Sequence, residues 1–235
     1  FLETNEKNFI ERLNSVYKAI KQTRKKLDKK KSLISFIGAP WTLIVYMLGL
    51  KKGKDVLDLN LLSKKKEEID LILSNLNKFL CAHIKNQVES GADVVQIFDS
   101  WAGLIPNEHI KKYCYDPNLN LVNFCKDNKI PVICFPKGIK DNYLNFCNIV
   151  KPDGINIDYN IDPEWVKKNI NGISIQGGLD PKILLKNEEN VYQEAEKYLK
   201  IFKDLPYIFN LGHGLLPETN PDIVEKLVNF VRNYK

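Results

Sequence analysis

The chain has 235 residues, of which 44% are hydrophobic and 27% charged, and this composition is ordinary for a globular protein of one large or two small domains. Its 35 lysines and arginines stand against 29 acidic residues, which gives a mild net charge of +6. Because no apolar run is long enough to span a bilayer, the composition excludes a membrane-spanning protein, and we expect a cytoplasmic one.

Much of the positive charge lies in short lysine runs. Such runs are typical of solvated helix ends and loops, and the alternative is a field that attracts an anionic substrate. The runs carry no interleaved aromatic residues and no base-reading motif, so we expect no nucleic-acid partner. The runs fall at residues 25–31, 51–54 and 64–66.

The five cysteines are an odd number, and none forms a C-x-x-C pair. Cys81 and Cys134 lie within apolar segments, where a thiol acts as a small hydrophobic group. This usage indicates a reducing compartment rather than a disulfide framework.

The spacing of apolar residues predicts helices and short buried strands in alternation along the whole chain. Ser63 is the expected N-cap of a long amphipathic helix that ends at Gly91, and the helix that follows is expected to be interrupted near Pro117. In chain order we predict a helix over 1–27, a strand over 32–37, a helix from 41 through 47, a helix over 63–90, a strand over 93–98, a helix over 107–125, a strand over 131–135, a helix over 143–150, a strand over 154–157, a helix over 163–170, a strand over 172–175, a helix over 188–202, a strand over 207–210 and a helix over 220–234.

This alternation, with short connections and no linker, predicts a single α/β domain over residues 1–235 with a parallel sheet. An open doubly wound sheet would carry a Gly-rich phosphate loop after an early strand, and no such sequence is present. A (β/α)8 TIM barrel instead places its chemistry at the carboxyl ends of many strands, where the unusual stretches of this chain fall. We therefore favour the barrel.

A closed barrel needs eight strands, whereas the pattern shows about six. Since a βα unit takes roughly 30 residues, we expect this chain to lack the first one or two βα units of the barrel.

His213 lies between two glycines just past a predicted strand, where an imidazole has an open side and could meet a ligand. The alternative is a tight turn in which His213 hydrogen-bonds its own loop. Ser100, at another strand end, could bind a ligand oxygen, cap the next helix or act as a nucleophile, although no G-x-S-x-G sequence surrounds it.

Three other residues near strand ends could have structural or functional roles. Tyr46, one turn beyond Thr42, could face the mouth of the barrel or serve as a packing residue. Asp158 could be an active-site carboxylate or could cap a loop. Asp180, which precedes Pro181, reads chiefly as a helix start.

The histidines do not suggest a metal site. His83, His109 and His213 are scattered, and the pair formed by Cys81 and His83 would point to different faces of one helix. Because zinc requires convergent ligands at recognisable spacing, we expect no metal.

Four blocks in order resemble the uroporphyrinogen decarboxylase family, over essentially the whole chain. They are residues 38–43 (GAPWTL) with Tyr46 and Met47, 98–101 (FDSW), 176–181 (QGGLDP) and 210–214 (NLGHG). The resemblance implies a TIM barrel and a carboxy-lyase without a cofactor. Its reaction removes carbon dioxide from the four acetate side chains of uroporphyrinogen III, giving coproporphyrinogen III in haem biosynthesis.

The resemblance also implies roles for four substrate-binding residues. Tyr46 matches a tyrosine that touches substrate and hydrogen-bonds the catalytic aspartate, and Ser100 matches a hydroxyl residue that binds substrate. Phe98 matches a wall of the cleft, and His213 matches a histidine that contacts a substrate carboxylate. The family further suggests a homodimer.

Two features of the family do not match. Its catalytic aspartate and an arginine-rich segment precede the GAPWTL block, and neither is found here, so the catalytic aspartate is expected upstream of Phe1. We expect the isolated chain to be inactive or nearly so. Gly178 also stands where many members have asparagine, and this variation is expected to be tolerated.

Two other classes stay open. A corrinoid-linked methyltransferase on the same fold would need a zinc-ligating His/Cys set, which cannot be assembled from this sequence. A non-catalytic porphyrinogen-binding remnant would retain Tyr46, Ser100 and His213 without turnover.

Overall fold

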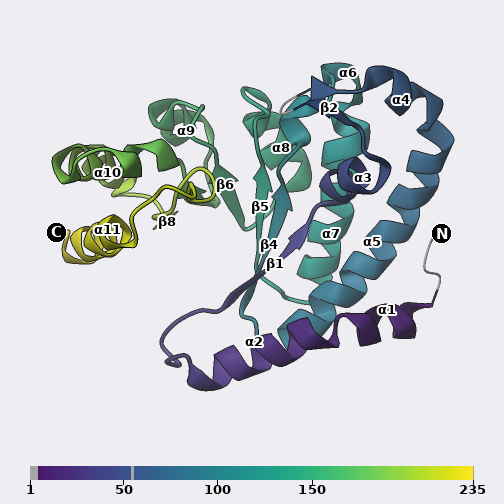
Figure 1. Ribbon diagram of the computed structural model, residues 1–235, viewed down its shortest axis with the longest axis horizontal. Coiled ribbons are helices and arrows are strands. Elements are labelled where there is room, and N and C mark those ends of the chain that lie inside the picture. The colour runs from purple at the N-terminus through teal and green to yellow at the C-terminus, as the bar shows by residue number, and fades with distance from the viewer. Residues whose placement is uncertain (1–4, 54–55, 235) are drawn as a thin grey trace. The chain divides into compact units, whose positions relative to one another are not determined.

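The computed structural model describes residues 5–53 and 56–234 of the chain (Figure 1). The chain divides into two compact units, one made of Phe1–Ile139 with Asn148–Pro152 and the other of Lys140–Cys147 with Asp153–Lys235. In the described residues, no helix combines the length and the apolar character needed to cross a bilayer.

The first unit is built on three parallel strands in the order β1 (Ile34–Gly38), β4 (Val94–Asp99) and β5 (Val132–Pro136). In their register, Gly38 is paired with Phe98, and Phe98 is paired with Phe135. The three strands therefore end at the same level, and the segments that follow them emerge on one side.

Helices of the first unit lie on one side of this sheet, and α5 and α7 pack against it (Figure 1). The long helix α5 buries Ile69, Leu73, Leu80 and Ile84, which are four residues of the predicted apolar face. Burial of each such side chain contributes about 1.5–3 kcal/mol. The elements outside the sheet are α1 (Glu6–Arg12), α2 (Asn14–Lys26), α3 (Pro40–Leu48), the hairpin β2 (Lys51–Gly53) and β3 (Val56–Leu57), α4 (Leu59–Lys64), α5 (Lys66–Glu89), η1 (Ala102–Leu104), α6 (Asn107–Ile110), η2 (Lys111–Tyr115) and α7 (Asp116–Asp127).

The second unit repeats the same alternation on the parallel strands β6, β7 and β8. Helix α10 packs against α9 and α11. The elements from the boundary onward are α8 (Asn142–Val150), β6 (Gly154–Ile157), α9 (Pro163–Asn169), β7 (Ser174–Gly177), η3 (Pro181–Leu185), α10 (Glu188–Phe202), β8 (Tyr207–Ile208) and α11 (Pro221–Asn233).

All six predicted strands are found, and the differences lie mainly at their ends. The strand predicted over 172–175 begins at Ser174 and continues to Gly177, and β8 ends at Ile208. The hairpin of β2 and β3, in the second lysine run, was not predicted from the pattern because it is very short. The predicted helix over 1–27 is divided at Leu13, and its residues 1–4 lie outside the described part.

The prediction that Ser63 caps the long helix is wrong. Ser63 lies inside α4, whose N-cap is Asp58, a side chain that accepts a hydrogen bond from the Leu61 N–H at 3.0 Å. Helix α5 begins after Lys65 without a side-chain cap, because the backbone only bends at Lys65 and then resumes a helical path.

The expected interruption near Pro117 takes the form of a π-helical turn, η2, directly before α7. Proline has no N–H to donate to the residue four positions earlier, so the α-helical ladder is broken at this point. The Asp116 N–H instead donates to the Lys111 carbonyl, five residues earlier.

None of the five cysteines, all of which lie in the described part of the chain, forms a disulfide, and four of them are buried, as expected for small hydrophobic groups. Burial raises the pKa of the Cys147 thiol to about 12 and that of the partly buried Cys81 thiol to about 11. These thiols are therefore protonated at neutral pH.

His83 of α5 connects the first two helices to the sheet. Its Nδ1 lies 2.9 Å from the Tyr17 hydroxyl of α2, and its Nε2 lies 2.7 Å from the Gln87 amide nitrogen, which also donates to the Phe36 carbonyl. Phe9 of α1 packs edge-on against the imidazole. Burial lowers the pKa of His83, so His83 binds a proton less readily in the folded chain than in the unfolded chain.

We therefore expect acid to destabilise the protein partly through His83. Since the folded pKa is lower than the unfolded one, stability falls as the pH drops through the ordinary histidine value of about 6.5. In urea unfolding at about pH 7.5 and pH 5, the loss of stability should be smaller for His83→Gln than for the unmodified chain. Both proteins retain His109 and His213, so their contributions cancel. An equal loss in the two proteins would contradict the prediction.

Candidate functional site

The carboxyl end of β4 carries a buried carboxylate, Asp99, which is only 1% exposed. The Thr42 hydroxyl of α3 donates to Asp99 Oδ1 at 2.8 Å, and the Asn118 amide of α7 lies 3.3 Å from Asp99 Oδ2. The Trp101 N–H in turn approaches Thr42 Oγ1 at 3.3 Å. We refer to Thr42, Asp99, Trp101 and Asn118 as the strand-end network, since it ties α3 to the turn that follows β4.

Local sequence explains how this network forms. Pro40 occupies the first helical position of α3, where its fixed φ favours helix initiation and its missing N–H costs nothing. Thr42 then lies in the first turn and faces β4. The register that pairs Gly38 with Phe98 places the start of α3 beside Asp99.

The ionisation of Asp99 is strongly affected by its environment. Burial raises the pKa of Asp99 to about 6, and hydrogen bonds from Thr42, Cys114 and Asn118 oppose the rise. The protonated form is therefore favoured by folding, and the stability that it contributes is lost as the pH rises through about 6.

Tyr46 and Ser100 both lie next to Trp101. Tyr46 is 64% exposed on α3, and its ring meets the Trp101 ring edge-on with 6.1 Å between centroids. Ser100 is half-buried between Asp99 and Trp101 in the chain. The Trp101 carbonyl also accepts a hydrogen bond from Trp41 Nε1 at 3.1 Å. The first unit thus brings together the segments that carry these two predicted residues.

Phe98 is half-buried and stands in a row of aromatic rings across the sheet. Its ring is 5.6 Å from that of Phe36 and 6.0 Å from that of Phe135, both edge-on. Phe36 is 66% exposed whereas Phe135 is buried, so only the Phe36 end of this row is open to solvent. That Phe98 lines a substrate cleft stays a prediction.

His213 belongs to the second unit and is exposed in the loop after β8. The loop is held by the Gly212 N–H, which donates to the Leu179 carbonyl at 2.7 Å, and by a parallel bridge between Leu179 and Leu211. A side chain at Gly212 would come 2.5 Å from the Tyr159 backbone nitrogen, whereas Gly214 has open space around it. The glycine before His213 is thus required by close backbone packing, and the glycine after it is not.

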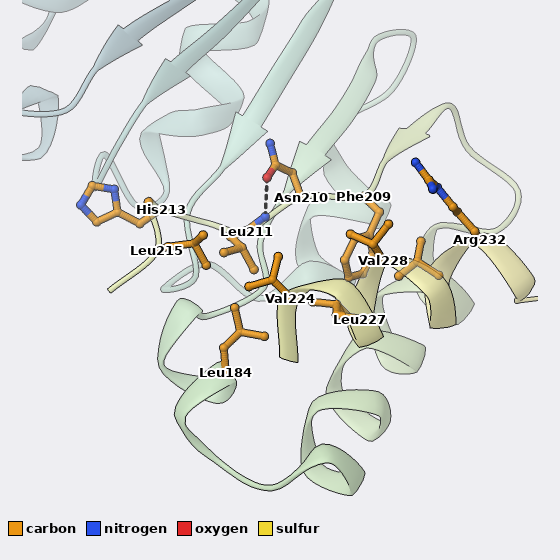
Figure 2. A pocket seen from close by; sticks show the side chains of 12 residues that line it. Leu184, Phe209, Asn210, Leu211, His213, Leu215, Val224, Leu227, Val228 and Arg232 are labelled. Atoms are coloured by element: carbon orange, nitrogen blue, oxygen red, sulfur yellow. Dashed lines mark hydrogen bonds between the residues drawn. The ribbon is translucent and has the colours of Figure 1, made fainter. Parts of the chain in front are cut away.

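A cavity of about 490 Å³ lies beside this loop within the second unit. Figure 2 shows His213 at one end of the lining side chains and Arg232 at the other, with leucine and valine side chains between them. The apolar lining comes from the loop, η3 and α11. Contact between His213 and a substrate carboxylate stays a prediction.

Asp158 is buried, with contacts that hold a loop. It accepts hydrogen bonds from the Tyr143 hydroxyl at 2.9 Å and from the Asn160 N–H at 2.8 Å. Burial, together with the neighbouring Asp158, holds the pKa of Tyr143 well above its usual value. The structure therefore supports the loop-capping reading of Asp158.

The QGGLDP block has a structural role in the second unit. Asp180 accepts a hydrogen bond from the Lys182 N–H at 2.9 Å and caps η3, which confirms its reading as a helix start. Gly178 has a φ of +102°, and an added Cβ would come 2.5 Å from the Tyr198 ring. The Tyr198 hydroxyl donates to the Gly178 carbonyl at 2.7 Å, so Tyr198 occupies the space that a larger residue would need.

Asn118 and Tyr143 were not identified from sequence. Each is a polar side chain within a segment interpreted as an ordinary amphipathic helix, and each is buried against a carboxylate. The only signal for Asn118 is its place directly after Pro117. Within the described ranges, no group of three or more His, Cys, Asp or Glu side chains could hold a metal ion.

Parallel strands alternating with helices, with polar side chains gathered at the strand ends, define an α/β protein of the TIM-barrel class. Solved structures support this class. A B12-independent methionine synthase from Shewanella sp. W3-18-1 matches 92% of this chain and 64% of its own, with a TM-score of 0.65 and 14% identity. The putative enzyme of that kind from Listeria monocytogenes matches with a TM-score of 0.58 and 15% identity. At such identities the likeness concerns the fold alone.

The sequence comparisons are more specific. The family model described as Uroporphyrinogen decarboxylase (URO-D) matches residues 2–234. The uroporphyrinogen decarboxylase of Rickettsia bellii is 39% identical over 231 residues, covering 97% of this chain and 68% of the relative. That of Wolbachia pipientis wMel is 36% identical over 222 residues, covering 93% and 64%. The chain belongs to the uroporphyrinogen decarboxylase family, which confirms the resemblance, and it spans about two thirds of the length of these relatives.

The strand-end network makes Thr42 important for stability. Thr42→Val removes a donor from a buried carboxylate and should lower the free energy of unfolding by about 2 kcal/mol when Asp99 is charged. Thr42→Ser retains the hydroxyl and is the matched control. The free energy of unfolding of both variants is measured in urea above and below the Asp99 pKa of about 6. The loss for Thr42→Val should be larger above this pH, where Asp99 is charged. A Thr42→Val protein as stable as Thr42→Ser would refute this role.

The loop that carries His213 gives a second matched pair. Gly212→Ala forces a Cβ against the Tyr159 backbone and should destabilise the protein by about 1–3 kcal/mol. Gly214→Ala, two residues away, meets nothing within 4 Å and should change stability by less than about 1 kcal/mol. Thermal and urea unfolding of the two variants provide the comparison. Equal stability of the two would show that the loop is not held at Gly212.

Proposed function

We propose that this chain acts in the decarboxylation of uroporphyrinogen III to coproporphyrinogen III, the reaction for which its relatives are named. Removal of carbon dioxide next to a pyrrole proceeds through a protonated, positively charged ring. A carboxylate aimed at the ring nitrogens stabilises that developing charge, so no cofactor is required.

The observation that carries the proposal is the hydrogen bond from Thr42 to Asp99. It joins the GAPWTL segment, which Tyr46 closely follows in the chain, to the FDSW segment, which contains Phe98 and Ser100. Two blocks that are distant in sequence and match the family therefore form one local site in the first unit.

The proposed roles follow from the chemistry of each side chain. The exposed Tyr46 hydroxyl and the Ser100 hydroxyl hydrogen-bond the substrate and its carboxylates, and Phe98 packs against the apolar face of a pyrrole ring. For His213, which belongs to the second unit, the family resemblance supports contact with a substrate carboxylate. No aspartate of this chain is assigned the catalytic role.

Three further properties belong to the same proposal. Residues 1–235 form a single barrel domain, two copies associate as a homodimer, and the protein works in the cytoplasm. The family resemblance and the strand pattern support the first property, and the resemblance alone supports the second. The odd number of cysteines without a C-x-x-C pair supports the third.

The test is decarboxylation of uroporphyrinogen III, followed by chromatography of the oxidised products. The isolated chain should turn over at least about 10²-fold more slowly than the Rickettsia bellii enzyme, since loss of one preorganised electrostatic group costs 10²–10³ in rate. A chimera that adds the part of that enzyme not matched by this chain should be active. Within the chimera, Tyr46→Phe should lower kcat/KM by about tenfold.

Tyr192→Phe is the control for the tyrosine variant, because it removes a hydroxyl bonded to Glu188 on α10, outside the proposed site. It should leave kcat/KM unchanged. A folded chimera that produces no coproporphyrinogen would reject the proposed reaction. Full activity of the isolated chain would reject the expectation that it lacks the catalytic group.

A further inference from the structure

Lys51 lies beside the proposed site in an arrangement that the family blocks do not include. It is the first residue of β2, which follows α3 closely in the chain. Its Nζ stands 3.4 Å from the centroid of the Trp101 ring, well within cation–π distance. Tyr46 packs edge-on against the same ring. The Trp101 ring therefore contacts both an ammonium group and the exposed tyrosine.

The position of this ammonium group depends on a fixed platform. The Trp101 carbonyl accepts from Trp41 Nε1, and the Trp101 N–H approaches the Thr42 hydroxyl. Thr42 is itself bonded to the buried Asp99. Because the backbone of Trp101 is held by both hydrogen bonds, the position of the residue that contacts Lys51 is fixed.

Lys51 has no acidic partner in the part of the chain that the structure describes. No carboxylate of residues 5–53 or 56–234 forms an ion pair with Lys51, whose ammonium group instead lies over the Trp101 ring. Lys112 shows the contrasting case in the same unit. Its Nζ stands 5.2 Å from the Tyr113 ring centroid but also lies 2.6 Å from an oxygen of Asp70. Lys51 thus keeps its charge available, whereas Lys112 does not.

Contact with an aromatic face leaves the N–H donors of an ammonium group free to bind an anion on the other side. Charge-assisted bonds to carboxylates are stronger than neutral ones, and more so where the group is partly desolvated, as the half-buried Lys51 is. An indole ring in contact with a cation fits a substrate that combines flat apolar rings with carboxylates.

We propose that Lys51 binds a carboxylate side chain of the substrate, next to Tyr46 and Ser100. This inference rests on the proposed function and adds a recognition residue to the same site. It also gives one residue of the second lysine run a specific role, while the other lysine runs retain their reading as solvated segments.

The experiment measures binding of uroporphyrin III, a stable octacarboxylate, to the full chain by porphyrin fluorescence anisotropy. Lys51→Gln should weaken binding by about tenfold, as expected for loss of one charge-assisted contact, and should reduce its dependence on salt. Lys51→Arg keeps the charge and should bind within about threefold of the unmodified chain. Lys112→Gln removes a lysine of similar geometry that is already paired, and should leave binding unchanged.

A second probe separates carboxylate recognition from ring packing. Coproporphyrin III has four carboxylates and the same ring, so the effect of Lys51→Gln should be smaller with this ligand. Lys51→Met, which keeps the apolar stem over Trp101, should behave like Lys51→Gln. Equal binding by Lys51→Gln and the unmodified chain would overturn the role of Lys51 alone. Absence of binding by the unmodified chain would overturn this role together with the proposed function.

Discussion

The first unit depends on one buried hydrogen bond, from the Thr42 hydroxyl to Asp99. A carboxylate that is 1% exposed is costly to bury, and it is tolerated only where donors surround it. Here the donors come from α3 and α7. The need to satisfy Asp99 therefore aligns two helices with the end of β4. As a result it positions the exposed Tyr46, which follows Thr42 in the chain, and the half-buried Ser100, which follows Asp99.

The second unit also contains a buried aspartate at a strand end, but its hydrogen-bond donors are of a different kind. Asp158 is satisfied by the Tyr143 hydroxyl and by the backbone of its own loop, and Gly212 packs directly on the chain that follows Asp158. In both units a buried aspartate at a strand end organises the backbone, and more exposed side chains lie nearby in the chain. Barrels typically carry their chemistry at the carboxyl ends of their strands.

Much of this arrangement could be predicted from the sequence, because alternating periodicity reports which faces are buried. The six strands, the helix over 188–202 and the strand-end positions of Ser100 and His213 followed from pattern alone. Strand lengths and the cap of α5 did not, since Ser63 has the chemistry of a cap but lies inside another helix. The partners of Asp99 and Asp158 were also missed, because pairing between distant polar residues leaves no periodic trace. Lys51 was read as one of a run of solvated lysines, and only the three-dimensional structure shows the indole beneath it.

The number of residues in the π-helical turn η2 decides whether the Asn118 side chain points toward Asp99. A residue advances an α-helix by about 100°, so a turn that holds one additional residue rotates everything after it by that angle relative to what came before. Asn118 lies just beyond η2, and its amide reaches both Asp99 and the Cys114 carbonyl. A single-residue deletion within 111–115 would remove the additional residue of η2 and turn Asn118 away from the carboxylate. The length of this segment is therefore under a constraint as strict as the identity of its residues.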